Sequence, residues 1–190
     1  MTGGRSSSPE RHNVHVALLR GINVGGRNKL PMSSLAEIFN DVGCSRVQSY
    51  IQSGNVVFEA TPALASRVPA VIAQAVLERF EFEVPVIVRT AEELKGIVQA
   101  NPFLQAGADE RTLHVAYLAD LPDVARVRAL DRDRSPPDEF EVRGREVFLR
   151  CPNGLARTKL TNAYFDSRLG TTSTVRNWRT TLRLLALAVG

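Results

Sequence analysis

The sequence has few of the residues that disulfide-rich and metal-binding proteins use. Its 190 residues include two cysteines and three histidines, with neither a CxxC pair nor a His/Cys cluster. These absences argue against a disulfide framework and a zinc site, so we expect no metal. Because unpaired cysteines are typical of a reducing compartment, we expect the protein to be cytoplasmic.

Long apolar runs and familiar catalytic motifs are absent as well. No run approaches the roughly 18 apolar residues of a membrane-spanning helix, so we expect no membrane partner. The stretch 1–13 has no apolar segment like that of a signal peptide, and we expect a disordered tail there. No GxSxG, HExxH or GxGxxG pattern occurs, so no cofactor is expected and the catalytic residues, if any exist, are unknown.

Basic residues are concentrated near the C-terminus. Residues 143–190 hold nine Lys or Arg and two acids, a net charge of +7, whereas the preceding residues carry −3. Such a segment favours a phosphate-bearing partner. The alternative is a compositional origin, because 21 of the 24 basic residues are Arg.

Hydrophobic residues make up 44% of the chain and follow a repeated order of strands and helices. In the first half we expect strands at 14–19, 47–52, 55–59 and 84–88, with helices near 34–42, 61–76 and 90–98. In the second half we expect strands at 112–118, 140–142, 146–149 and 174–176, with helices near 124–130, 158–169 and 178–189.

Local signals mark several boundaries. Ser34 and Thr90, each followed three residues later by Glu, predict capping boxes at helix starts. Thr61 and Thr158 predict two further N-caps. Ser53-Gly54 predicts a two-residue hairpin turn between two strands.

The two halves also resemble each other in sequence. The segment HVALL at 15–19 recurs as HVAYL at 114–118, and the hairpin at 53–54 recurs at 143–144. We therefore predict an α+β protein of two tandem ferredoxin-like (βαββαβ) halves forming one compact unit. The expected halves are 14–100 and 101–190, the second ending in a C-terminal helix.

The first half alone carries a glycine-rich cationic loop, RGINVGGRNK at 20–29. Glycines permit a close backbone approach, Arg20 and Lys29 add positive charge, and Asn23 adds an amide, as an anion site requires. The loop is not a nucleotide-hydrolysing phosphate loop, because it lacks the Ser or Thr that holds Mg²⁺ and Pro31 delays the helix. The alternative interpretation is an exposed turn without a ligand.

Two further polar segments are candidates for the same site. The hairpin tip gathers Gln52, Ser53 and Asn55, although these residues also suit an ordinary turn. The turn from Asn153 to Lys159 is expected to open a helix. Because cations at a helix N-terminus are unfavourable by about 0.3–1 kcal/mol each, such a turn favours a bound anion.

A fourth candidate segment contains Arg176 and, two residues later, Trp178. A tryptophan between cations suits the stacking of a base or ring. The alternative is that Trp178 anchors the core at the start of an amphipathic helix.

In these segments the sequence closely resembles the domain of unknown function 1697 family, a family of uncharacterised bacterial proteins. The matching segments are ALLRGINVGG at 17–26 with Lys29, YIQSGNV at 50–56, NPF at 101–103, Asn153-Gly154, KLTN at 159–162 and RNW at 176–178. The resemblance runs from about residue 14 to the end. It implies two similar α+β halves and implies no activity.

We expect one ligand site in a cleft formed by the loop 20–29, the hairpin tip 52–55 and the turn 153–159. Its expected residues are Arg20, Asn23, Lys29, Gln52, Ser53, Asn55, Asn153, Lys159, Arg176 and Trp178. The leading hypothesis is binding of a phosphate-bearing ligand, either nucleic acid or a small molecule such as a nucleotide. The alternatives are an enzyme acting on a phosphorylated or carboxylated metabolite, with Tyr50 or Lys159 as proton donor, and a ligand-free interaction protein. The oligomeric state is open.

Overall fold

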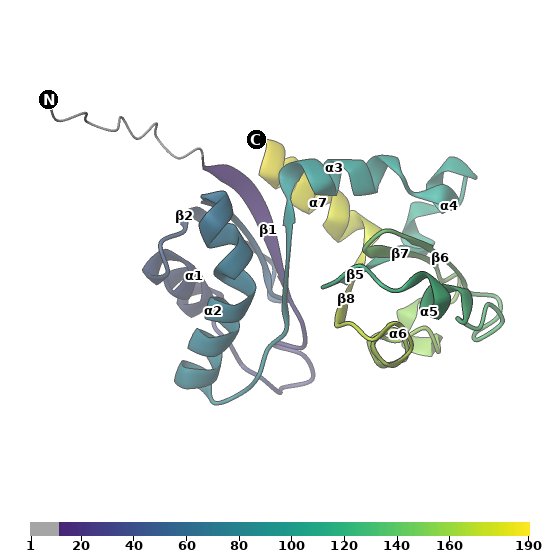
Figure 1. Cartoon of the computed structure of the whole chain (residues 1–190), viewed down its shortest axis with the longest axis horizontal. Helices are drawn as coiled ribbons and strands as arrows, with labels where there is room; N and C mark the ends of the chain where they lie inside the picture. The colour runs from purple at the N-terminus through teal and green to yellow at the C-terminus, as the bar shows by residue number, and fades with distance from the viewer. Residues whose placement is uncertain (1–11) are drawn as a thin grey trace, which may run out of the picture.

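The computed structural model describes residues 12–190 and consists of two halves with one element order (Figure 1). The first half contains β1 (Asn13–Leu19), α1 (Met32–Asp41), β2 (Ser45–Tyr50), β3 (Asn55–Ala60), α2 (Pro62–Phe80) and β4 (Val86–Thr90). The second half contains β5 (Leu113–Leu118), α5 (Val124–Arg128), β6 (Glu139–Arg143), β7 (Glu146–Arg150), α6 (Asn162–Leu169) and β8 (Ser173–Asn177). The helices α3 (Ala91–Gln99) and α4 (Pro102–Gln105) connect the two halves, and α7 (Trp178–Val189) is the last helix of the chain. Most of the predicted tail 1–13 lies outside the described residues, and β1 already begins at Asn13.

Residues 12–190 form two four-stranded sheets with the strand orders β2-β3-β1-β4 and β6-β7-β5-β8. Neighbouring strands are antiparallel throughout. This is the ferredoxin-like arrangement, and the prediction of two such halves is confirmed. The strands β1, β3 and β5 are almost entirely buried, because both of their faces are covered.

The buried apolar residues of the described chain form three clusters. The first lies between the first sheet and the helices α1 and α2, with Phe39 and Phe58 at its centre. Another lies between the second sheet and α6, around Phe165. The middle cluster joins the remaining faces of both sheets to α3 and α7, through residues such as Val16 and Tyr117. The two halves therefore share the middle cluster, and α3 and α7 pack against each other within it (Figure 1).

Several predicted boundaries are confirmed and others are wrong. Thr61 caps α2, and Thr90 forms the expected capping box with Glu93. The prediction for Ser34 is wrong: α1 already begins at Met32, because the carbonyl oxygen of Pro31 accepts the first helical hydrogen bond, from the N–H of Leu35. The first hairpin turn spans the four residues 51–54 rather than two, because β2 ends at Tyr50.

Two buried arginines connect the halves, and they occupy equivalent positions. Arg89 in β4 pairs with Val16 of β1, and Arg176 in β8 pairs in the same way with Val115 of β5. Val16 and Val115 are themselves matched by the repeated segment at 15–19 and 114–118. The last strand of each sheet therefore supplies one arginine to the junction.

Each arginine donates hydrogen bonds to residues of the opposite half. Arg89 Nη2 donates to the carbonyl oxygen of Leu118 at 2.6 Å, and Arg89 Nε donates to Glu146 Oε1 at 2.9 Å. Arg176 Nη2 donates to the carbonyl oxygen of Leu19 at 2.6 Å, and Arg176 Nε donates to Asn55 Oδ1 at 2.6 Å. We call these contacts the Arg89 clamp and the Arg176 clamp.

The acceptors are equivalent as well, apart from their charge. Asn55 lies opposite Leu18 in the first sheet, and Glu146 lies opposite Tyr117, the counterpart of Leu18. The side chain of Arg89 is 1% exposed and forms an ion pair with Glu146. Arg176 meets the neutral amide of Asn55 at the corresponding place. One clamp is therefore an ion pair and the other is not.

We predict that Glu146→Gln lowers the free energy of unfolding by about 3 kcal/mol, because it leaves the Arg89 guanidinium buried without a counter-charge. Chemical denaturation checks this. The matched control is Glu141→Gln, which removes a carboxylate from an exposed pair with Arg143 in the same hairpin and is expected to cost under about 1 kcal/mol. Equal losses for the two variants would contradict the assignment.

Candidate functional site

A cavity of about 470 Å³ lies where β1 runs into the glycine-rich loop. The loop contributes Arg20 and Gly21, the hairpin tip contributes Ser53, and the turn 153–159 contributes Leu155. Its other wall consists of residues of the second half: His114, Asn162, Thr174, Val175, Arg176, Asn177 and Thr180. We call it the Arg176 cavity. All three segments expected to form the site reach it.

The predicted site residues divide into two groups. Arg20, Ser53 and Arg176 line the cavity. The following residues do not line it: Asn23, Lys29, Gln52, Asn55, Asn153, Lys159 and Trp178. Among these, four side chains belong to exposed residues: Lys29, Gln52, Asn153 and Lys159.

Asn23 and Asn55 hold the walls in place instead. Asn23 Nδ2 donates to the carbonyl oxygens of Leu30 (2.8 Å) and Gln52 (2.9 Å), which ties the loop to the hairpin. The buried Asn55 accepts from Arg176 and donates to Ser53 Oγ at 2.9 Å. Both asparagines thus shape the site from behind the residues that face the cavity.

The expected helix start at Thr158 is wrong. Thr158 Oγ1 accepts from the backbone N–H of Leu160, and α6 begins only after Thr161, whose hydroxyl accepts from the N–H of Tyr164. Lys159 consequently precedes the helix. The argument for an anion from cations at a helix N-terminus therefore does not hold in this protein.

Trp178 does not stack on a ligand at the surface. It is 0% exposed and packs in the middle apolar cluster, so the interpretation as a core anchor is the right one. Its neighbour Asn177, which caps α7 through its side-chain oxygen, faces the cavity in its place.

Arg176 provides a buried positive charge at the cavity wall. Its Nη1 donates to Thr174 Oγ1 and the carbonyl oxygen of Val175, and its Nη2 donates to three carbonyl oxygens. All these acceptors are neutral, and within residues 12–190 Arg176 forms no salt bridge. Burial lowers the pKa of Arg176 to about 10, so the group remains charged at neutral pH.

The other cation of the wall is already paired. Arg20 Nη1 donates to Asp166 Oδ2 at 2.6 Å and to the carbonyl oxygen of Ser173 at 2.9 Å. Asp166 also accepts from the hydroxyl and the N–H of Ser173. The charges of Arg20 and Asp166 therefore cancel each other, and the charge of Arg176 leaves the cavity with a formal charge of +1.

Five polar residues of the wall, among them His114, Asn162 and Asn177, were not predicted as site residues. His114 was interpreted as structural, yet it lines the cavity, as do Asn162 and Asn177. The Nδ1 of His114 lies 3.2 Å from the carbonyl oxygen of Thr112, so it donates there and Nε2 is left as an acceptor. The repeat with His15 was a visible signal for His114, whereas Asn162 and Asn177 look like ordinary helix-start residues in the sequence.

The rim of the cavity is apolar and strained. Val24 is 64% exposed and Ile51 is 51% exposed, and both line the opening. Ile51 has a φ of +50°, which is rare for a β-branched residue and costs about 1–3 kcal/mol. The rim can cover an apolar part of a ligand, while the guanidinium of Arg176 is buried.

The family model described as "Protein of unknown function (DUF1697)" matches residues 13–148. The chain belongs to this family. No curated protein matches it significantly. The DUF1697 family model ends before β8 and therefore does not reach Arg176.

A solved structure supports the fold of this DUF1697 protein. It is described as that of the conserved bacterial protein SP0830 from Streptococcus pneumoniae, and it matches with a TM-score of 0.72 at 20% sequence identity. The match covers 95% of this chain and 100% of that chain. At this identity the likeness shows the fold alone.

Neither a metal centre nor a membrane span is found in the described part of the chain. Residues 12–190 contain no group of three or more His, Cys, Asp or Glu placed to hold a metal ion. In the same range, no helix is long and apolar enough to cross a membrane.

We predict that the free energy of unfolding decreases as the pH falls from 7 to 5. Burial lowers the pKa of His15 and of His114, so below about pH 6.5 the unfolded chain binds protons that the folded chain does not. Denaturation at several pH values checks this, and the double variant His15→Gln/His114→Gln should show a weaker dependence. An unchanged dependence in that variant would contradict the prediction.

Proposed function

We propose that the Arg176 cavity binds a small organic anion, with a phosphate or carboxylate group on a partly apolar body. The observation that carries this proposal is the buried Arg176 guanidinium, which has neutral hydrogen-bond partners only. A buried charge without a counter-charge is unfavourable, and an anion in the adjacent cavity would offset it.

The Arg89 clamp supports this interpretation by comparison. Arg89 donates a hydrogen bond to Glu146, and at the equivalent position of the other half Arg176 donates to Asn55. The same backbone arrangement therefore accommodates a carboxylate in one half. In the other half the carboxylate is missing beside the cavity, and a ligand can supply it.

The ligand would be held by the charge of Arg176 and by direct bonds to other groups. Every N–H group of Arg176 already has an acceptor within the protein, so this residue attracts the anion through its field. The side chains of Ser53, Asn162 and Asn177 line the cavity and offer hydroxyl and amide donors. Val24 and Ile51 would contact the apolar part of the ligand at the rim.

The size of the cavity favours a small molecule over nucleic acid. A volume of about 470 Å³ lies within the usual range of roughly 300–1,000 Å³ for small-molecule sites. The cations that a nucleic acid would use, Lys29 and Lys159 among them, are exposed and lie outside the cavity wall. Of the two phosphate-bearing partners expected from the sequence, we therefore propose the small molecule.

Binding without catalysis is the simpler proposal. Neither Tyr50 nor Lys159, the proton donors named for an enzyme, lines the cavity. We also propose a cytoplasmic location, where phosphate-bearing metabolites are abundant. Cys44 and Cys151 are buried free thiols, as is usual in a reducing compartment.

We predict that Ser53→Asp weakens binding of phenyl phosphate and benzoate at least tenfold, because it places a carboxylate in the cavity. The matched control, Ser53→Asn, has nearly the same shape without the charge and should retain binding within about threefold. Two-dimensional NMR titration measures both affinities and locates the site through the resonances of His114 and Ile51. Circular dichroism establishes that both variants are folded.

Two outcomes would contradict the proposal. One is that neither probe shifts resonances of the cavity wall in the unaltered protein at low salt. The other is that Ser53→Asp and Ser53→Asn bind the probes equally well.

A further inference from the structure

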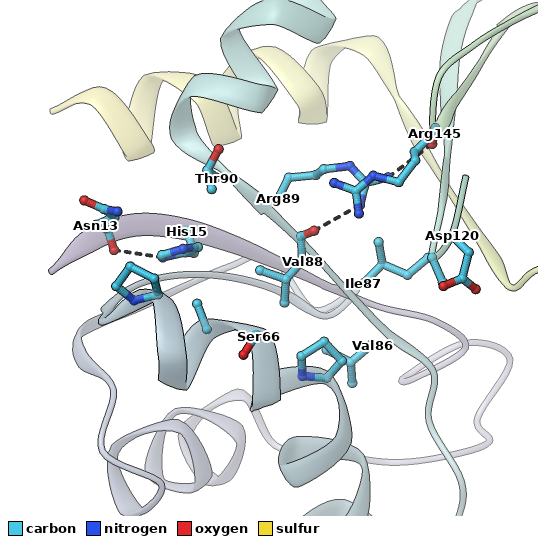
Figure 2. Close-up of a pocket in the computed structure, with 14 residues that line it drawn as sticks. Asn13, His15, Ser66, Val86, Ile87, Val88, Arg89, Thr90, Asp120 and Arg145 are labelled. Carbon is cyan, nitrogen blue, oxygen red and sulfur yellow. Dashed lines mark hydrogen bonds between the residues drawn. The ribbon is translucent and has the colours of Figure 1, made fainter. Parts of the chain in front are cut away.

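A second cavity, of about 480 Å³, occupies the corresponding place in the first half (Figure 2). His15 and Arg89 line it, as their counterparts His114 and Arg176 line the Arg176 cavity. The strand register confirms the correspondence: His15 pairs with Thr90, and His114 pairs with Asn177. We call it the Asp120 cavity, after the acidic residue in its wall.

Most of the wall of the Asp120 cavity is apolar. The helix α2 contributes Ala65 and Pro69, and β4 contributes Val86 and Val88. In Figure 2, His15 lies toward the Thr90 end of β4, and Asp120 lies toward Ile87. A ligand spanning the cavity would thus meet polar groups at both ends and apolar groups between them.

The two arginines of this wall are neutralised within the protein. Arg89 forms its ion pair with Glu146, and Arg145 Nη2 donates to Glu93 Oε1 at 2.5 Å. Both carboxylates belong to the same junction between the halves. The basic residues therefore leave no unbalanced positive charge here, in contrast to the Arg176 cavity.

Asp120, an exposed residue, is the charge of the wall that lacks an ionic partner. Its Oδ2 accepts from the hydroxyl of Thr171 at 2.9 Å, and within residues 12–190 it forms no salt bridge. His15 adds a second acceptor, because its Nδ1 donates to the carbonyl oxygen of Asn13 at 2.8 Å and leaves Nε2 free. The unbalanced charge at this cavity is therefore negative.

We infer that the Asp120 cavity is a second binding site, which takes a small organic cation with an ammonium group on an apolar body. The ammonium group binds the carboxylate of Asp120, and the body packs against Ala65, Pro69, Val86 and Val88. Duplication thus produced two cavities of similar size and opposite charge preference. This inference is independent of the proposed anion site.

A pair of probes with the same ring tests this inference directly. In an NMR titration at low salt, benzylammonium is expected to shift resonances of Val88 and Ala119, whereas benzoate leaves them unchanged. Asp120→Asn should weaken benzylammonium binding at least fivefold without affecting benzoate. Thr171 still finds an acceptor in the asparagine amide oxygen, so this variant should fold.

The matched control is Asp133→Asn, which removes one exposed carboxylate away from the cavity and should leave both affinities unchanged. Equal benzylammonium affinities in the two variants, no shifts at Val88 and Ala119, or shifts caused there by benzoate would each overturn the inference. The anion probe and the cation probe report on different cavities. If one probe does not bind, the titration with the other still tests its own cavity.

Discussion

Burial of a guanidinium group requires that its donor nitrogens find acceptors, and this protein meets the requirement twice in a similar way. Arg89 and Arg176 each extend from the last strand of one sheet to carbonyl oxygens of the other half. These acceptors lie at the ends of β1 and β5 and in the hairpin turns beside them, so the clamps fix which ends of the two sheets meet. The shared apolar cluster with α3 and α7 completes the junction. The two cavities lie beside the clamps because β4 forms part of the wall of the Asp120 cavity and β8 forms part of the wall of the Arg176 cavity.

The functional proposal depends on one difference between otherwise matching halves. Glu146 neutralises Arg89, whereas Asn55 leaves Arg176 with its charge. The glycine-rich loop adds to this difference, since β1 is followed by twelve residues before α1 and β5 by only five before α5. The loop brings Arg20 and the exposed Val24 to one cavity only. On our proposal, one of two similar halves carries a site suited to anions without any change in strand order.

Much of the fold was predictable from the sequence, because strand and helix periodicity and the repeat of residues 15–19 at 114–118 are local signals. The starts of α1 and α6 were less predictable, since α1 begins without a side-chain cap and Thr161, rather than Thr158, caps α6. At the candidate site, Arg20, Ser53 and Arg176 were predicted to face a ligand and do line a cavity. The Arg89 clamp was not predictable: Arg89 is one arginine among 21, and its role depends on contacts with residues 29 to 57 positions away. Asn55 and Trp178 were expected at the surface of the site and proved to be buried beneath it or in the core.

The central claim is that an unneutralised Arg176 makes one cavity, and not its counterpart, attractive to anions. The most direct measurement is the anomalous scattering of bromide in crystals soaked in sodium bromide. We predict a bromide site in the cavity lined by Ser53, Asn177 and Arg176, and none in the cavity lined by His15 and Asp120. Bromide in both cavities, or only beside Asp120, would contradict the account, as would an empty Arg176 cavity in a crystal whose lattice leaves it open.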